Sequence, residues 1–206
     1  MSQLLHYLTI FKKDVAQHYR KHEETFDLES FHGRFHIIRC LVLIDKIDQF
    51  YISKGISLDV HAVYYAILFH DIAREGNGYD EWEEQSATKC YNYLIAQNKT
   101  DEEAVEISRL ILKEFPLKIE GQIVYDVDVL DYNRFFWLPE EESLFDKKRL
   151  RVASKNDVSG IEDEIFRTEI IKFAQQLVMF SEKLPISIST EELTRKMYEY
   201  YLSLNQ

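Results

Sequence analysis

Apolar residues along most of the chain recur three and four positions apart, which is the spacing of one face of an α-helix. The segment after Ser57 shows this spacing at Val60, Val63, Tyr64, Ile67 and Leu68. The pattern predicts a helix that enters the core, and Asp71 continues its apolar face.

Two other segments carry the capping-box motif of helix N-termini. In Thr100-Asp-Glu-Glu103 and Ser189-Thr-Glu-Glu192, a hydroxyl residue precedes a glutamate by three positions. Each side chain of such a pair can satisfy a free backbone N–H group of the other residue. Both motifs therefore predict the start of a helix.

The last third of the chain contains two apolar stripes with helical spacing. The first consists of Phe166, Ile170, Phe173 and Leu177, and the second of Leu193, Met197, Tyr200 and Leu204. The stripes predict two packed scaffold helices that are joined near Pro185. Residues 139–160 are expected to be irregular.

The segment Gly121–Asp131 fits both a helix and a strand. Val124, Asp128 and Asp131 share a helical face, whereas Asp126 and Asp128 alternate with valines as they would in a strand. We favour the helix, because the chain offers no second convincing strand to pair with this one.

Composition limits the fold class. The chain of 206 residues is 46% apolar, which suffices for one sizeable core and argues against two full domains. Its 6 glycines and 3 prolines are too few for a protein built from many tight β-turns. We therefore predict an all-α, single-domain bundle that comprises residues 1–206.

Charge and hydropathy exclude several classes of partner. The net charge of −11 repels nucleic acid polymers, and no basic block interleaved with aromatic residues offers a local exception. The sequence shows no membrane-spanning apolar run and no secretory signal, so no membrane partner is expected. Cys40 and Cys90 are typical of buried thiols in a reducing compartment, which favours a cytoplasmic location.

Candidate chemistry lies in three separated segments. They are Phe31-His-Gly-Arg-Phe-His-Ile-Ile-Arg-Cys40, Phe69-His-Asp-Ile72 and Tyr125-Asp-Val-Asp-Val-Leu-Asp131. His70 and Asp71 follow an apolar helical run, where buried polar groups are costly without a partner. One divalent ion would satisfy both side chains, and Mn, Fe, Co, Ni, Zn and Mg all stay open as its identity.

These segments resemble the HD-domain superfamily of metal-dependent phosphohydrolases. The match consists of His36 followed by Arg39, the pair His70-Asp71, and Asp128 within Asp-Val-Leu-Asp, and it extends over residues 31–135. The resemblance implies an HD-type helical bundle in which four side chains converge on one metal ion. The motif-bearing core would comprise residues 27–136, and helices within 142–206 would pack on it.

The resemblance also implies roles for residues around the metal. His32 lies four positions before His36, so we expect the two imidazoles to share one face of a helix. His32 matches a general acid, because similar His pairs in HD-type enzymes use the earlier histidine in this way. Glu84, in a Glu-x-Ser-Ala segment, matches a supporting or catalytic carboxylate. Phosphate charge needs cations, and the candidates are Lys113, Arg74, Arg109 and Arg134, with Lys113 preferred.

The chain departs from richer members of the superfamily in two places. No histidine lies between Asp71 and Asp128, which disfavours a second metal. Arg74 occupies a position at which some nucleotidases have a glutamate, which argues against a nucleotidase-like mechanism.

The leading hypothesis is hydrolysis of a phosphate ester in a small phosphorylated substrate, of which a nucleotide is one candidate. An alternative is a non-catalytic HD module that binds a nucleotide or a partner protein and keeps a structural metal. An iron oxygenase or lyase ranks last, because such sites usually need more ligands. Oligomeric state stays open between a monomer and a homodimer.

Overall fold

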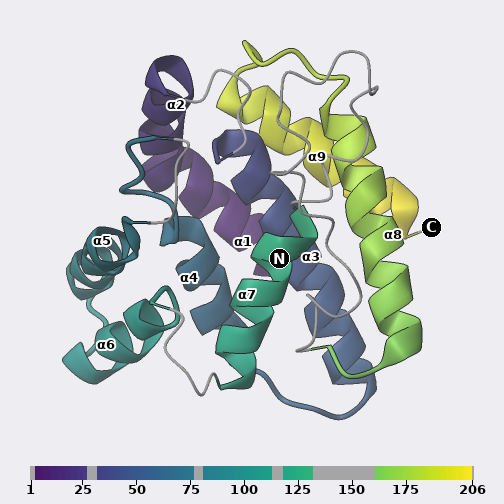
Figure 1. The fold of residues 1–206 in the computed structure, drawn as a ribbon, viewed down its shortest axis with the longest axis horizontal. Helices are drawn as coiled ribbons and strands as arrows, with labels where there is room; N and C mark the ends of the chain where they lie inside the picture. Colours follow the sequence, from purple (N-terminus) through teal and green to yellow (C-terminus); the bar gives the residue numbers. More distant parts are fainter. Residues whose placement is uncertain (1–2, 27–31, 77–80, 113–117, 132–160, 206) are drawn as a thin grey trace.

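The long helix α3 (Arg34–Ser53) forms the centre of the molecule. Its apolar residues from Ile37 to Ile44 are almost fully buried, and a helix that is apolar on nearly all sides is buried by neighbours on each of them. Helices α1, α4, α7, α8 and α9 all contact α3, and Figure 1 shows it enclosed among them.

The computed structural model describes residues 3–26, 32–76, 81–112, 118–131 and 161–205. Throughout these ranges the regular elements are helices, so the predicted all-α class is confirmed. In chain order they are α1 (Gln3–Ile10), the π-helical turn η1 (Phe11–Val15), α2 (Ala16–Thr25), α3, α4 (Val60–Phe69), α5 (Glu83–Ala96), α6 (Asp101–Arg109), α7 (Ile119–Asp131), α8 (Glu164–Ser181) and α9 (Thr190–Leu204).

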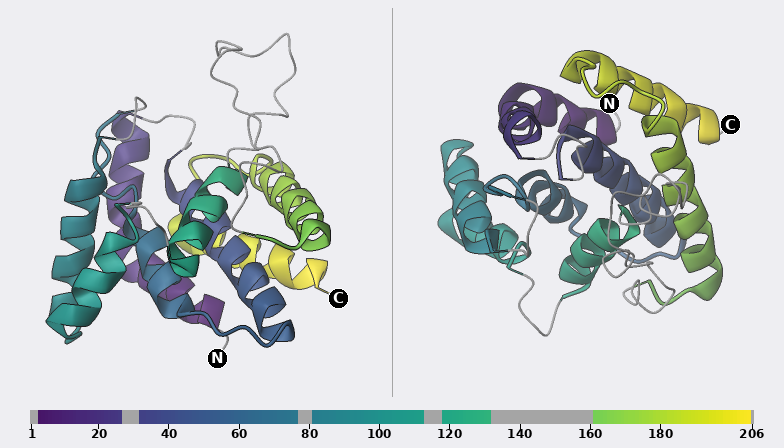
Figure 2. Two further views of the ribbon diagram at one scale, coloured as in Figure 1. Left: turned by 60° about the horizontal axis from the view of Figure 1, so that its bottom comes forward. Right: turned by 45° about the horizontal axis from the view of Figure 1, so that its top comes forward.

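The helices form two groups around α3 and α4. Helices α5 and α6 pack on each other and on α4, whereas α8 and α9 pack on α3. The two pairs lie at opposite ends of the molecule in Figure 1, and both views in Figure 2 keep them apart. Among the described helices, none is long and apolar enough to cross a membrane.

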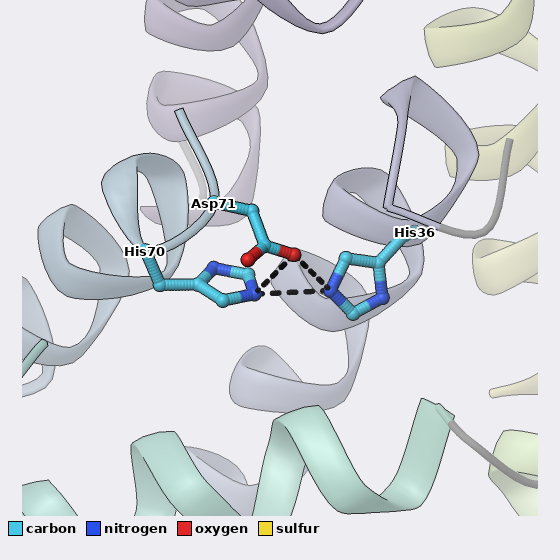
Figure 3. A group of neighbouring side chains, drawn as sticks. All are labelled: His36, His70 and Asp71. Carbon is cyan, nitrogen blue, oxygen red and sulfur yellow. Dashed lines mark hydrogen bonds and ion pairs between the residues drawn. The ribbon is translucent and has the colours of Figure 1, made fainter. Parts of the chain in front are cut away.

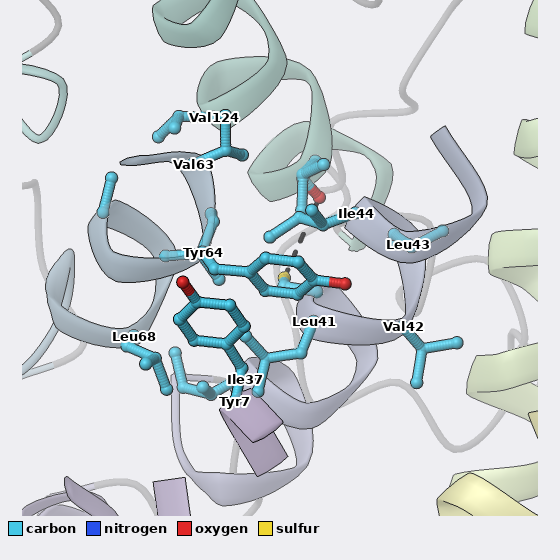
Figure 4. Packing of buried hydrophobic residues seen from close by; sticks show 14 of the residues in the cluster. Tyr7, Ile37, Leu41, Val42, Leu43, Ile44, Val63, Tyr64, Leu68 and Val124 are labelled. Carbon is cyan, nitrogen blue, oxygen red and sulfur yellow. Dashed lines mark hydrogen bonds between the residues drawn. The ribbon is translucent and has the colours of Figure 1, made fainter. Parts of the chain in front are cut away.

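Aromatic stacking joins the N-terminal helix to the centre of the core. The rings of Tyr7 and Tyr64 are stacked, with centroids 4.2 Å apart and planes 9° from parallel. Figure 4 shows this pair packed against aliphatic side chains of α3 such as Ile37 and Leu41. Such offset aromatic pairs add about 1 kcal/mol to the free energy of area burial.

Several local predictions are confirmed. The segment after Ser57 forms α4, whose first turn is capped by Asp59, and the ambiguous segment that ends at Asp131 is the helix α7. The two C-terminal stripes lie on α8 and α9. On α9, however, Tyr201 is buried and Tyr200 only partly so, because the helix is rotated slightly from the predicted face.

Both predicted helix caps are present. The Thr100 hydroxyl accepts a hydrogen bond from the Glu103 amide at 3.2 Å, and the Glu103 carboxylate accepts one from the Thr100 amide at 3.0 Å. The Ser189 hydroxyl accepts from the Glu192 amide at 3.2 Å. The region 139–160, predicted to be irregular, lies outside the described residues.

We expect Thr100→Ala to lower the free energy of unfolding by about 1 kcal/mol, because the Glu103 amide in the first turn of α6 loses its acceptor, the Thr100 hydroxyl. Urea denaturation followed by circular dichroism measures the change. Thr88→Ala is the matched control, since the Thr88 hydroxyl is exposed in α5 and bonds only to the carbonyl of Glu84 among its described contacts. Equal losses in the two variants would contradict the capping account.

A buried ion pair joins the start of α3 to α2 and to the α8–α9 connection. The Glu23 carboxylate accepts from the Arg34 amide at 2.6 Å and from its Nε at 2.7 Å. The other guanidinium nitrogens of Arg34 donate to the carbonyls of Ile188 and Ile186 at 2.9 and 3.0 Å. Neither charged side chain is more than 5% exposed, so each depends on the other for its solvation.

Candidate metal centre

Three helices bring the predicted metal ligands together. His36 lies in the first turns of α3, His70 and Asp71 lie in the turn that ends α4, and Asp128 lies near the end of α7. Figure 3 shows the imidazoles of His36 and His70 and the Asp71 carboxylate pointing toward one another. Residues distant in sequence thus share one site because α3, α4 and α7 pack together.

The potential ligand atoms lie within a few ångströms of each other. His36 Nε2 is 3.0 Å from His70 Nε2, 3.9 Å from Asp71 Oδ2 and 3.5 Å from Asp128 Oδ1. His70 Nε2 is 3.4 Å from Asp71 Oδ2 and 3.7 Å from Asp128 Oδ1. His36, His70 and Asp71 form a group that could hold a metal ion, and Asp128 adds a second carboxylate beside both imidazoles.

Hydrogen bonds on the outer side of each ring fix the direction of its lone pair. His36 Nδ1 is 2.7 Å from Asp131 Oδ2, and His70 Nδ1 is 2.8 Å from the Ile67 carbonyl oxygen. Both partners only accept hydrogen bonds, so each Nδ1 must carry a proton and donate it. The Nε2 atoms of the two rings, which face one another, are then the atoms left to bind a cation.

Two facing lone pairs 3.0 Å apart repel each other unless a cation lies between or beside them. The negative charge around His70 also favours a cation at this position. Burial by itself lowers the pKa of His70, but the carboxylates of Asp71 and Asp128 outweigh it and raise the pKa to about 9. The two carboxylates therefore favour a positive charge at His70 Nε2, which lies 3.4 Å from Asp71 Oδ2 and 3.7 Å from Asp128 Oδ1.

Positive neighbours keep the Asp71 carboxylate ionised. Burial raises its pKa, but His70, His32 and Arg74 together outweigh the burial, so that the pKa falls below its usual range. An ionised carboxylate is the form that binds a metal ion. The site therefore offers its oxygen ligand in the required state.

Arg74 supports Asp71 and packs on an aromatic ring. Its Nη1 lies 3.4 Å from Asp71 Oδ1, and its Nε donates to the Gly76 carbonyl at 2.9 Å. The guanidinium lies over the Trp82 ring, 5.4 Å from the centroid. Arg74, predicted to bind substrate, is thus a buried partner of a metal-ligand candidate.

His32 lies beside the cluster but not on the predicted helix. The helix α3 begins at Arg34, so the prediction that His32 and His36 share one helical face is wrong. Gly33 precedes the helix in an extended conformation, and the chain turns there. The His32 ring nevertheless lies 6.3 Å from the His36 ring and contributes to the charge felt by Asp71.

The remaining predicted residues lie in different surroundings. Glu84 is exposed in the first turn of α5, and Arg109 is exposed at the end of α6. Lys113 and Arg134 lie outside the described residues. In the segment that contains Glu84, the structure instead places Ser86 near the site, where its buried hydroxyl accepts from the Ala73 amide at 3.2 Å.

The three aspartates of α7 have different neighbours. Asp128 faces the imidazoles, whereas Asp126 is buried near Tyr51 and raises the pKa of that residue, second to the effect of burial. Asp131, one turn after Asp128, binds His36 and also accepts from Arg39 at 2.6 Å. Arg39 thus forms a buried ion pair with Asp131.

Sequence reasoning missed two residues that support the site. Tyr19 of α2 is buried, and its hydroxyl donates to the Leu68 carbonyl at 3.0 Å, just before the His70-Asp71 turn. Ser181, the last residue of α8, accepts from Arg39 Nη1 at 3.0 Å. Neither belongs to a motif, so only their positions in the fold reveal them.

Cys40 lies close to the Nδ1 atom of His36. Its sulfur is 3.6 Å from His36 Nδ1, and Cys40, His36 and Asp131 form a second group that could hold a metal. Because His36 Nδ1 already donates to Asp131, this group fits a packing role better than a second ion.

No protein-family model, no curated protein and no solved structure matches the chain. The geometry and chemistry of the site therefore carry the functional proposal.

Proposed function

We propose that the chain is a metal-dependent phosphohydrolase of the HD type, acting on a small phosphorylated compound. One observation carries the proposal. The Nε2 atoms of His36 and His70 face each other at 3.0 Å, with carboxylate oxygens of Asp71 and Asp128 beside both.

The donor set fits one divalent ion. Ligand atoms about 2.1 Å from a common ion lie about 3.0 Å apart at right angles and about 3.4 Å apart in a tetrahedron. The distances from each imidazole nitrogen to the other donors run from 3.0 to 3.9 Å, so small movements would satisfy either geometry. Two neutral imidazoles and two carboxylates balance the charge of a divalent ion and suit a first-row metal.

A divalent ion at this position would activate a water molecule and polarise a phosphoryl oxygen. His70 and His36 present nitrogen lone pairs, and Asp71 and Asp128 supply the compensating charge. His32, whose ring centroid is 6.3 Å from that of His36, would deliver a proton to a departing alkoxide. Arg74 adds positive charge beside Asp71 and would help to balance the charge of an anionic substrate at the ion.

The test is metal removal and refilling. Protein treated with a chelator should hydrolyse no phosphate ester, and addition of Mn²⁺, Co²⁺ or Ni²⁺ should restore turnover of at least one compound in a panel of small phosphomonoesters, phosphodiesters and nucleotides. Release of inorganic phosphate or of the alcohol measures the activity. No turnover with any of these ions would contradict the enzymatic proposal.

A second candidate is a non-catalytic module that keeps the ion for structure. It is favoured by the placement of Arg74, whose guanidinium is engaged by Asp71, Gly76 and Trp82, and by the exposure of Glu84. This candidate predicts that the refilled protein gains thermal stability but turns over no compound in the panel.

A further inference from the structure

A chain of buried hydrogen bonds leads from the metal-site face of α3 to the C-terminal helix α8. His36 Nδ1 donates to Asp131 Oδ2 at 2.7 Å. Arg39 holds both oxygens of that carboxylate, with Nε 2.6 Å from Oδ1 and Nη2 2.9 Å from Oδ2. Arg39 Nη1 then donates to the Ser181 hydroxyl at 3.0 Å.

Asp131 determines which nitrogen of His36 can bind a cation. A neutral imidazole carries one proton, and the ring nitrogen without it is the ligand. Because the ionised carboxylate only accepts, it favours the tautomer with the proton on Nδ1 and the lone pair on Nε2. Nε2 is the atom that faces His70 at 3.0 Å.

Arg39 and Ser181 in turn determine the orientation of Asp131. A guanidinium that binds both oxygens of a carboxylate fixes the plane of that group. The Ser181 hydroxyl donates its own proton to the Val178 carbonyl at 3.0 Å, so its oxygen is left to accept from Arg39. All of these side chains are buried, and solvent does not compete for their hydrogen bonds.

We propose that Asp131 and Arg39 are positioning residues that hold His36 in its metal-binding tautomer, and that Ser181 makes α8 part of the metal centre. The inference rests on the proposed function only in requiring that a divalent ion binds His36. The sequence predicts α8 only as a scaffold helix. The inference gives this helix an effect on metal affinity, through Ser181.

The first test is the metal affinity of Asp131→Asn. Competition with a chelating dye, using Zn²⁺ and Mn²⁺, should show that this variant binds the ion about 10- to 100-fold more weakly than the unmodified protein does. This is the usual effect of removing a group that hydrogen-bonds to a metal-binding histidine. The matched control is Asp45→Asn. Asp45 also lies on α3 and links it to other helices, by accepting from the hydroxyls of Tyr64 and Tyr201, but it lies more than two turns from His36.

The control separates positioning from stability. Both variants should lower the melting temperature, but only Asp131→Asn should weaken metal binding. Ser181→Ala serves as the milder variant, and remains informative if Asp131→Asn does not fold. It should weaken binding in the same direction by a smaller factor, because the carboxylate keeps its bonds to Arg39 and His36.

The second test reads the tautomer itself. Long-range ¹H–¹⁵N spectra of the Zn²⁺-loaded protein should show His36 bound through Nε2 with its proton on Nδ1, and Asp131→Asn should lose this single pattern. Suppose that the unmodified protein binds the ion, and that both Asp131→Asn and Ser181→Ala bind it as tightly and show the same His36 pattern. The inference is then wrong, and the proposed function stands. If the unmodified protein binds no divalent ion, both are wrong.

Discussion

Asp128→Asn is expected to lower kcat/KM of the Mn²⁺-loaded protein by about 10³-fold, equivalent to about 4 kcal/mol of transition-state stabilisation. Asp128 Oδ1 lies 3.5 and 3.7 Å from the two imidazole nitrogens, so the substitution removes a charged ligand from the site. The metal-free variant should stay folded, because the change also relieves repulsion between two carboxylates. Steady-state kinetics and a thermal melt measure the two effects.

The control for this prediction is Asp126→Asn on the same helix. Asp126 is also buried, but the carboxylates paired with the imidazoles are those of Asp71, Asp128 and Asp131, so its substitution should change stability and leave kcat/KM within a few-fold of the original. Equal kinetic effects in the two variants would contradict the assignment of Asp128. A large loss of melting temperature only in Asp128→Asn would instead support the structural-metal alternative.

Glu23→Gln is expected to lower the free energy of unfolding by about 3–5 kcal/mol, the usual effect of removing one partner of a buried ion pair. The substitution leaves the Arg34 guanidinium buried without its counter-charge and weakens the bond to the first amide of α3. Urea denaturation measures the change. The double variant Glu23→Gln/Arg34→Met should recover part of it, since the buried charge is then gone.

An exposed ion pair provides the comparison. Lys12 and Glu191 also join distant segments, at 2.8 Å, but the glutamate side chain is 76% exposed. Glu191→Gln should therefore change stability by less than about 0.5 kcal/mol. If Glu23→Gln were equally mild, Arg34 would not depend on Glu23 for its solvation.

The helices were largely predictable from the sequence, because their signals are local. The spacing after Ser57, the caps at Thr100 and Ser189, and the absence of a partner strand for the segment that ends at Asp131 each concern a few neighbouring residues. The face that each helix buries was harder to predict. Tyr201 rather than Tyr200 is buried on α9, since packing against α3 sets the rotation of that helix.

The members of the candidate site were predictable only in part. His36, His70, Asp71 and Asp128 were selected together by a resemblance, and the structure places them side by side. The start of α3 at Arg34 was missed, because its N-cap residue, Gly33, has no side chain and the first amide is capped by Glu23 on another helix.

Contacts between distant residues left no signal in the sequence. Ser181 lies 142 positions from Arg39, and nothing in either segment indicates that they meet. Arg74 was predicted to bind substrate because it is a cation near the motif, but its contacts with Asp71 and Trp82 depend on how the turn after α4 folds back on α5. Side-chain partners of this kind follow from tertiary packing alone.

The most direct test of the central claim is an anomalous-scattering map from crystals soaked in Mn²⁺ or Zn²⁺. The account predicts one strong peak, about 2.0–2.3 Å from the Nε2 atoms of His36 and His70 and from carboxylate oxygens of Asp71 and Asp128. A map with no peak between these side chains, or with the metal bound elsewhere on the chain, would contradict it.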